Sequence, residues 1–255
     1  SFSQTDGSFS VLLAEPQLKI KEQSIEIGAI GVAGAKAIHQ AEYTLAGYLD
    51  HFELNEAAVA AITTNAEVFG LTIEQQDLFE QVSPRVRLEK VQWHLAPARL
   101  RESLTVLGDV ANLELSLAGA VPGLAGLSGF VQFGLGAGYL DVDATDARLQ
   151  FGSLYDQPWS IQKVQGRVAY RQAEDGYALT SGKLVASVDG LAADVKLHMN
   201  LTQDRRLRTW GLAIGAKDFD LGAALPFIPN TVPETATSWL NENLLAGHSS
   251  ITGLF

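Results

Sequence analysis

The sequence contains no cysteine, and this absence excludes disulfide frameworks, thiolate zinc sites and cysteine nucleophiles together. Basic residues are also few: 18 Lys and Arg stand against 29 Asp and Glu, which gives a formal net charge of −11 at pH 7. The longest basic run is the pair Arg205-Arg206. A binding surface for nucleic acid needs clustered positive charge, so the composition predicts no nucleic-acid partner.

Long hydrophobic runs are missing as well. No window of about 18 residues is uninterrupted and apolar, and residues 1–10 lack the basic and apolar regions of a signal peptide. The chain starts close to a strand-like segment at Phe9–Leu13 and stops just after a turn at Gly253–Phe255. We therefore expect residues 1–255 to be one segment of a longer protein, with any membrane anchor outside it.

Hydrophobic residues are abundant, at 47% of the sequence, and they alternate with polar ones. In Ala193–Leu201 every odd position is apolar and every even position is polar. The same period of two occurs in segments 17–21, 112–117, 147–151 and 210–214. This period places apolar side chains on one face of a pleated strand, so the sequence predicts a mainly β fold with half-buried strands.

Short turn signals separate these segments and contain the glycine and aspartate that hairpins use, as in 135–138, 173–176 and 189–190. Short connections join antiparallel neighbours, so we expect a meander. Segment 128–133 also resembles segment 165–170, and each is followed by a glycine turn and a Gly-Tyr strand start. This repetition favours stacked hairpin units.

Helical signals are few. Asn55 precedes the run 56–62 as a capping residue does, and segment 72–75 has the spacing of a capping box. Near the C-terminus, Pro233 and Gly247 frame a segment in which apolar residues repeat every four positions. We expect short helices in the first region and a one-sided apolar helix of roughly three to four turns in the second.

Catalytic and cofactor motifs are lacking. The five histidines are scattered, without metal-ligand spacing, and we interpret them as solvated or singly hydrogen-bonded. No nucleophile elbow, phosphate loop or zincin motif occurs. Segment 134–138 holds three glycines, but an alternating strand follows it where a nucleotide loop requires a helix. The sequence predicts neither an enzyme nor a bound cofactor or metal.

Asp141, Asp143 and Asp146 form the densest acidic cluster. The glycine and the downstream glutamate of a calcium loop are missing. Asp141 and Asp143 alternate with Leu140 and Val142, which places the carboxylates on the outer face of a strand and favours simple surface display over weak cation binding. Because the two carboxylates share a face, an enzyme acting on glycans is a further hypothesis, although no tryptophan-lined sugar platform accompanies them.

The candidate functional residues are apolar positions in the predicted strands of the second half of the chain. They can fill the core of a closed sandwich, or they can line an open groove that holds an apolar ligand, and alternation alone does not separate the two. The set consists of Val131, Phe133, Leu140, Val142, Leu149, Phe151, Val168, Tyr170, Leu184, Val188, Val195, Leu197, Leu212 and Ile214.

A segment near the C-terminus resembles a known family. The spacing of its prolines and of its Trp-Leu pair is similar to the signature of the AsmA-like family, specifically of its YhdP branch. Segments 127–133 and 161–170 also resemble strands of that family, with Tyr170 where tryptophan is usual. The similarity extends over about residues 49–255. The signature residues are Pro229, Pro233, Trp239, Leu240, Leu244 and Gly247.

The resemblance implies a function. Members of this family resemble bridge-like lipid transporters, in which an inner-membrane helix precedes an extended β-groove that crosses the periplasm and holds phospholipid acyl chains. For this chain it implies a long, curved antiparallel meander forming an open apolar groove, with a helical insertion at 49–83, β-repeats at 84–215 and a helical segment at 220–247. It also implies a periplasmic location, an inner-membrane helix outside the chain and possible envelope-protein partners.

A competing hypothesis is a non-catalytic scaffolding module of the cell envelope. Such a module would have a closed and filled β interior, and it would contact other proteins through its acidic surface. The two hypotheses differ in whether the apolar stripes face a closed core or an open groove.

Overall fold

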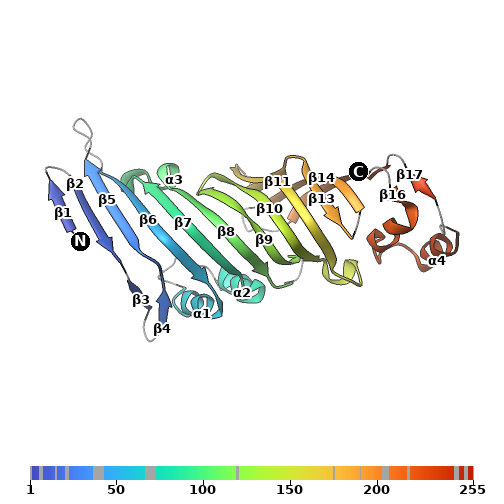
Figure 1. Cartoon of the computed structure of the whole chain (residues 1–255), viewed down its shortest axis with the longest axis horizontal. Helices are drawn as coiled ribbons and strands as arrows, with labels where there is room; N and C mark the ends of the chain where they lie inside the picture. Colours follow the sequence, from blue (N-terminus) through green and yellow to red (C-terminus); the bar gives the residue numbers. More distant parts are fainter. Residues whose placement is uncertain are drawn as a thin grey trace.

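The structure is a computed structural model that describes residues 2–5, 8–14, 16–20, 23–36, 43–66, 73–118, 121–174, 176–189, 191–202, 207–216, 219–243, 247–249 and 252–254. Strands dominate these residues, and Figure 1 shows most of them in one long sheet seen face-on. The strands of this sheet are β1 (Phe2–Thr5), β2 (Ser8–Leu13), β5 (Ile30–Lys36), β6 (Tyr43–Leu54), β7 (Arg85–Leu95), β8 (Thr105–Leu115), β9 (Gly123–Gly134), β10 (Ala137–Gln150), β11 (Trp159–Ala173), β12 (Gly176–Ser181), β13 (Leu184–Val188), β14 (Leu191–Thr202), β15 (Leu207–Ala216) and β18 (Thr252–Leu254).

The 14 strands follow one another across the sheet almost in chain order. The path is β1-β2-β5-β6-β7-β8-β9-β10-β11-β12-β14-β15-β18, and β13 lies off it, paired with β11 and β14. Each neighbouring pair is antiparallel. Two hairpins stand apart from the sheet: β3 (Gln17–Ile20) with β4 (Gln23–Glu26), and β16 (Phe219–Asp220) with β17 (His248–Ser249). The predicted mainly β fold and antiparallel meander are confirmed.

The helices are short and lie at the rims of the sheet (Figure 1). They are α1 (Glu56–Thr64), α2 (Ile73–Val82), α3 (Leu100–Ser103) and α4 (Glu234–Asn243), with 3-10 turns η1 (Pro97–Arg99), η2 (Gly152–Leu154) and η3 (Leu221–Phe227). Asn55 caps α1 as predicted, because its side-chain oxygen accepts a hydrogen bond from the Ala58 amide at 3.0 Å. The capping box predicted at 72–75 begins outside the described residues.

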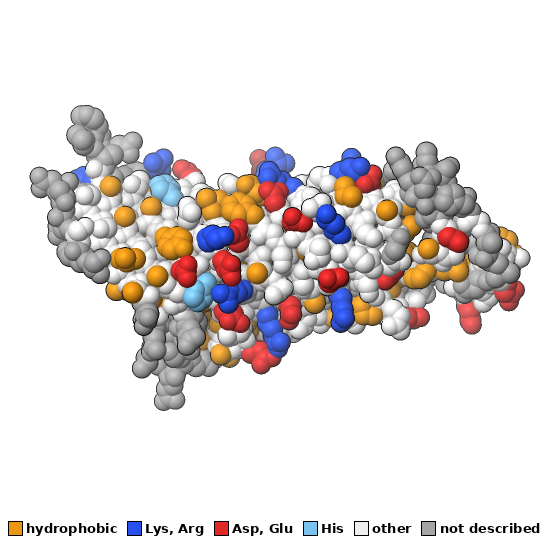
Figure 2. Space-filling model, in the orientation of Figure 1, with side chains coloured by type: hydrophobic (Ala, Val, Ile, Leu, Met, Phe, Trp, Pro, Cys, Tyr) orange, Lys and Arg blue, Asp and Glu red, His pale blue; other side chains and the backbone are white. Residues whose placement is uncertain are grey.

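The cross-strand register divides the side chains between two faces, because residues directly opposite each other in an antiparallel pair share a face. We call the side that carries hydrophobic side chains the apolar face. Its members include Leu45, Leu49, Leu88, Trp93, Val106, Val110, Val131, Phe133, Leu140, Val142, Val168, Tyr170, Leu179, Val195 and Leu197. We call the opposite side the polar face; its members include Arg87, Glu89, Asp109, Asp141, Arg167, Asp194, Lys196 and His198. Basic and acidic side chains are interspersed across it in Figure 2.

Three β-bulges keep the apolar residues on one face. The register shifts at Lys90, Asn112 and Asp146, each of which has a positive φ of 51 to 57°. A bulge adds one residue to its strand, so the spacing between consecutive apolar residues grows from two to three, as between Ala144 and Ala147. Both alanines remain buried, at 3% and 1% exposure.

The apolar face is only half-buried along much of its length. The solvent-accessible surface of the chain is 16133 Å², whereas a compact protein of 27.3 kDa exposes about 11,000 Å². Among the described residues no large side chain is less than 2% exposed. The largest buried cluster joins β10, β11 and β13 and includes Val142 and Val188 at 6% and 8% exposure. A smaller one forms where Ala58 and Ala61 of α1 pack on Phe52 and Leu54.

Aromatic rings lie flat on the apolar face where the neighbouring strand offers a glycine. Trp93 of β7 covers Gly47 of β6, and a Cβ added at Gly47 would clash with the indole. Tyr170 of β11 covers Gly138 of β10 in the same way, with 2.6 Å between such a Cβ and Tyr170 Cε1. Packing a ring against a strand glycine replaces the missing side-chain contacts and keeps the ring low on the sheet.

Gly47→Ala is therefore expected to lower the free energy of unfolding by about 1–3 kcal/mol, the usual cost of overpacking, because the new methyl group displaces the Trp93 indole. Urea unfolding followed by circular dichroism measures the change. Gly211→Ala is the matched control, since Gly211 is also a strand glycine and its added Cβ meets nothing within 4 Å. Equal stability of the two variants would contradict the ring-on-glycine contact.

Candidate functional site: the apolar face of the sheet

The structure brings the sequence-predicted groove residues together on the apolar face. Leu140 stands between Val131 and Val168 in the register, Leu184 stands opposite Val195, and Leu197 stands opposite Leu212. Phe133, Val142, Leu149, Tyr170, Val188 and Ile214 continue the same face on these strands. Phe151 follows the end of β10 and packs against the buried cluster of this face.

The face also extends into the N-terminal half of the sheet, which the sequence reasoning missed. Leu45, Leu49, Leu88, Trp93 and Val106 all lie on it. Their alternation is weaker in the sequence because Gly47 interrupts it on β6 and the bulge at Lys90 shifts it on β7. From β6 to β14, no Asp, Glu, Lys or Arg among the described residues lies on the apolar face.

Phe133 and the half-buried Tyr170 form an aromatic pair where β9 and β11 flank Gly138. Their ring centroids are 5.8 Å apart, and the Tyr170 hydroxyl donates a hydrogen bond to the Gly134 carbonyl. Burial raises the pKa of Tyr170. Phe133 nevertheless remains 40% exposed, so this part of the face presents an aromatic surface to solvent.

A second aromatic cluster lies at the opposite ends of these strands. Trp159 packs edge-on against Phe151, Tyr155 and Phe227, with ring centroids 4.7, 4.8 and 5.0 Å away. Phe227 ends η3 and also packs against the cluster of Leu191 and Ala216. The segment that contains η3 therefore crosses over the apolar face between β11 and β15.

The family-signature residues lie in and after this covering segment. Pro229 follows η3, Pro233 precedes α4, and Trp239 within α4 is 61% exposed. Leu240 is half-buried, Gly247 lies beyond the helix, and Leu244 lies outside the described residues. Of the predicted helix, the structure describes α4 over Glu234–Asn243, and the Asn243 side-chain amide donates to the Trp239 carbonyl at 2.8 Å.

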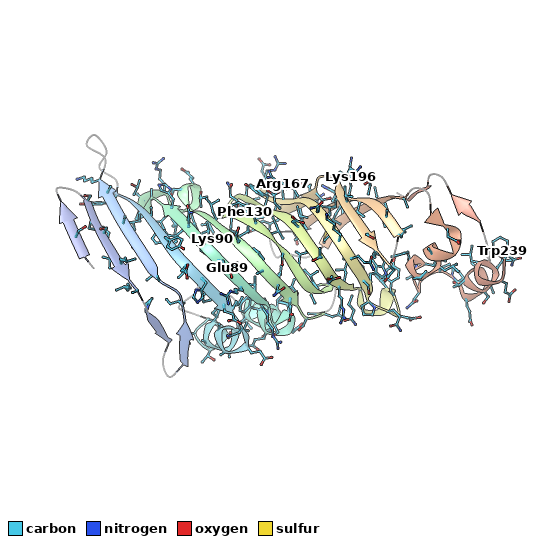
Figure 3. The ribbon with its side chains drawn as sticks, in the orientation of Figure 1. Glu89, Lys90, Phe130, Arg167, Lys196 and Trp239 are labelled. Atoms are coloured by element: carbon cyan, nitrogen blue, oxygen red, sulfur yellow. The ribbon has the colours of Figure 1, made fainter. Side chains whose placement is uncertain are left out.

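Several charges of the polar face pair with one another. The Arg167 guanidinium donates two hydrogen bonds of 2.6 Å to the Asp141 carboxylate and lies 3.8 Å from the centre of the Tyr139 ring. Lys90 pairs with Asp109 at 2.9 Å, and Lys183 pairs with Asp194 at 2.7 Å. Figure 3 labels Lys90 and Arg167, which both lie on this face.

In the acidic cluster, Asp141 has the wrong environment for a general acid. Hydrogen bonding to Arg167 lowers the pKa of Asp141, which therefore stays ionised, whereas a general acid needs a raised pKa. Asp143 accepts a hydrogen bond from Gln165 at 2.9 Å. Within the described part of the chain, no group of three metal-ligating side chains occurs.

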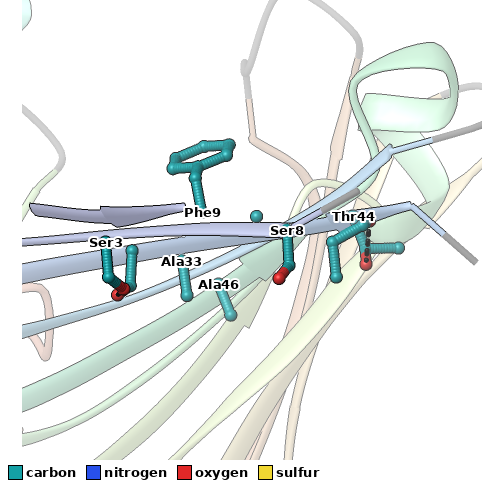
Figure 4. Close-up of a pocket in the computed structure, with 9 residues that line it drawn as sticks. Ser3, Ser8, Phe9, Ala33, Thr44 and Ala46 are labelled. Atoms are coloured by element: carbon teal, nitrogen blue, oxygen red, sulfur yellow. Dashed lines mark hydrogen bonds between the residues drawn. The ribbon is translucent and has the colours of Figure 1, made fainter. Parts of the chain in front are cut away.

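A shallow depression of about 320 Å³ lies at the N-terminal end of the polar face. Ser3, Ser8, Ala33, Thr44 and Ala46 line it, and Figure 4 shows the Phe9 ring leaving the sheet on the other side. Its lining consists of small side chains and offers no charged group. Phe9 and the small side chains therefore lie on opposite faces of the sheet.

The family described as YhdP protein matches residues 1–253. The chain belongs to the YhdP family. No curated protein and no solved structure matches the chain. The YhdP family is, in general terms, one of lipid-transport-related, non-enzymatic proteins of the cell envelope. Across the described residues of this YhdP-family chain, we find no helix with the length and apolar character needed to cross a membrane.

Arg167→Gln is expected to raise the pKa of Asp141 toward the ordinary aspartate range. Because the folded-state pKa of Asp141 is lowered, the ion pair stabilises the fold above the unfolded-state pKa of about 3.9, and this contribution is lost as the pH falls through the folded-state value. A pH titration of the Asp141 carboxyl by NMR measures the shift. Arg148→Gln changes another arginine of the polar face and should leave Asp141 unchanged; equal titration of Asp141 in all three proteins would refute the pairing.

Proposed function

We propose that the chain is a periplasmic segment of a lipid conduit, which holds phospholipid acyl chains against its apolar face on their way between the inner and outer membranes. The observation that carries this proposal is the open apolar face itself. It continues from β6 to β14 without a charged side chain among the described residues, and Phe133 on it stays 40% exposed. Exposed apolar surface on a folded protein is a mark of binding sites.

The energetics of such a face suit a sliding lipid. An acyl chain gains about 0.8 kcal/mol for each CH₂ group that leaves water. Successive strands present similar aliphatic side chains, so the free energy changes little as the chain moves from one strand to the next. A charged headgroup finds no partner on the apolar face and is better left in water.

The scaffolding alternative fits these observations less well. A closed module would bury its large side chains, but the chain exposes about 5,000 Å² more surface than a compact protein of its mass. The polar face would supply the contact surface of a scaffold, yet several of its charged side chains already pair with one another, as Asp141 does with Arg167. The unfilled face therefore supports a conduit over a scaffold.

Phe133→Glu is expected to reduce the phospholipid bound by the chain at least about tenfold, because a carboxylate on the apolar face loses its hydration against an acyl chain. Native mass spectrometry of the purified chain measures the bound phospholipid. Gln132→Glu places the same charge one residue away on the polar face and should leave the lipid content unchanged.

Thermal unfolding of both variants separates binding from folding. Since Phe133 is already 40% exposed, Phe133→Glu should keep a melting temperature close to that of Gln132→Glu. Equal lipid content in the two variants would overturn the proposed conduit. Wholesale unfolding of Phe133→Glu alone would instead assign Phe133 to a closed core and contradict the open face.

A further inference from the structure

The indole nitrogen of Trp159 is a buried donor without a protein acceptor. Trp159 is 9% exposed, and of the side chains that the structure describes it holds the one buried polar atom that lacks a hydrogen-bond partner. A donor removed from water in this way normally finds an acceptor, because leaving it unpaired costs free energy. The unpaired N–H lies on the apolar face, at the start of β11.

The surroundings of Trp159 are aromatic and aliphatic. Phe151, Tyr155 and Phe227 pack around the indole at 4.7 to 5.0 Å, and Leu149 stands opposite it on β10. Burial raises the pKa of Tyr155, in keeping with a water-poor cluster. Aromatic ring faces are weaker hydrogen-bond acceptors than a carbonyl oxygen. The cluster therefore gives the Trp159 indole N–H no strong acceptor.

Polar contacts attach the cover over Trp159 to a neighbouring loop. Phe227 is the last residue of η3. Beyond it, the backbone amide of Asn230 donates to the backbone carbonyl of Leu154 at 2.9 Å. The Asn230 side chain donates to Asp156 at 2.9 Å. These contacts attach the covering segment to the loop between β10 and β11, and the Phe227 ring fills the space beside the indole.

We propose that Trp159 donates a hydrogen bond to the ester carbonyl oxygen of a lipid on the apolar face, and that the Phe227 ring holds this place when no lipid is bound. The inference rests on the proposed lipid conduit and adds a fixed polar contact to it. A neutral carbonyl attached to an acyl chain suits a single uncharged donor among apolar groups. A phosphate does not, because the rings that pack around the indole carry no positive charge to offset its loss of water.

The test compares an ester-linked phosphatidylcholine with its ether-linked analogue, which has the same chains and headgroup but no carbonyl oxygens. Binding of each lipid to the 255-residue chain is measured by titration. The wild-type chain should bind the ester lipid about fivefold more tightly, the value of one ordinary hydrogen bond. Trp159→Phe keeps a ring in the cluster but removes the donor, and it should abolish the preference while leaving the affinity for the ether lipid unchanged.

Trp93→Phe is the matched control, because Trp93 is another indole of the apolar face; it should keep the fivefold preference. Phe227→Ala should raise the affinity for both lipids and keep the preference, since no ring then has to be displaced. Equal affinity of the wild-type chain for both lipids would overturn the Trp159 subsite and leave the conduit intact. Failure of the wild-type chain to bind either lipid would overturn the conduit itself.

Discussion

Strand register is the constraint on which the rest of this structure depends. A slip of one residue between two antiparallel strands would turn every apolar side chain of the slipped strand toward the polar face. Fourteen strands avoid this outcome even though several contain an extra residue. The bulges at Lys90, Asn112 and Asp146 absorb the extra residues at positive φ, so that Ala144 and Ala147 return to the same side of the sheet. A continuous apolar face exists only because each bulge compensates its strand locally.

A one-layer sheet of this size lacks the second layer that usually buries an apolar face. Its stability must come from within the sheet: from the backbone ladder, from rings lying on strand glycines such as Trp93 on Gly47, and from small covered clusters under α1 and η3. A ligand that binds the folded sheet and not the unfolded chain adds to that stability in proportion to its concentration. Lipid binding on the apolar face would thus supply part of the burial that other folds obtain from a second layer.

Local pattern was enough to predict much of this fold. Strict alternation predicted the strands and the common face of residues such as Leu140 and Val168, and Asn55 marked the start of α1. Contacts between distant segments were out of reach, because no periodicity in the sequence connects Trp159 with Phe227. The extent of the face was also underestimated, since Gly47 and the bulge at Lys90 obscure the alternation on β6 and β7. Whether an alternating strand is covered depends on what packs above it, and strand sequence carries no information about that.

The polar face and the apolar face differ in charge, and this difference bears on how a lipid would bind. On the polar face, Asp141 and Arg167 neutralise each other, and the remaining surface carries the net negative charge of the sequence. An anionic headgroup gains nothing from such a surface and is repelled from it at short range. The apolar face has no charge of either sign between β6 and β14 among the described residues, so it neither repels a lipid nor traps it by ion pairing. The acidic composition that argues against nucleic acid thus also directs a lipid to the one face where its acyl chains can leave water.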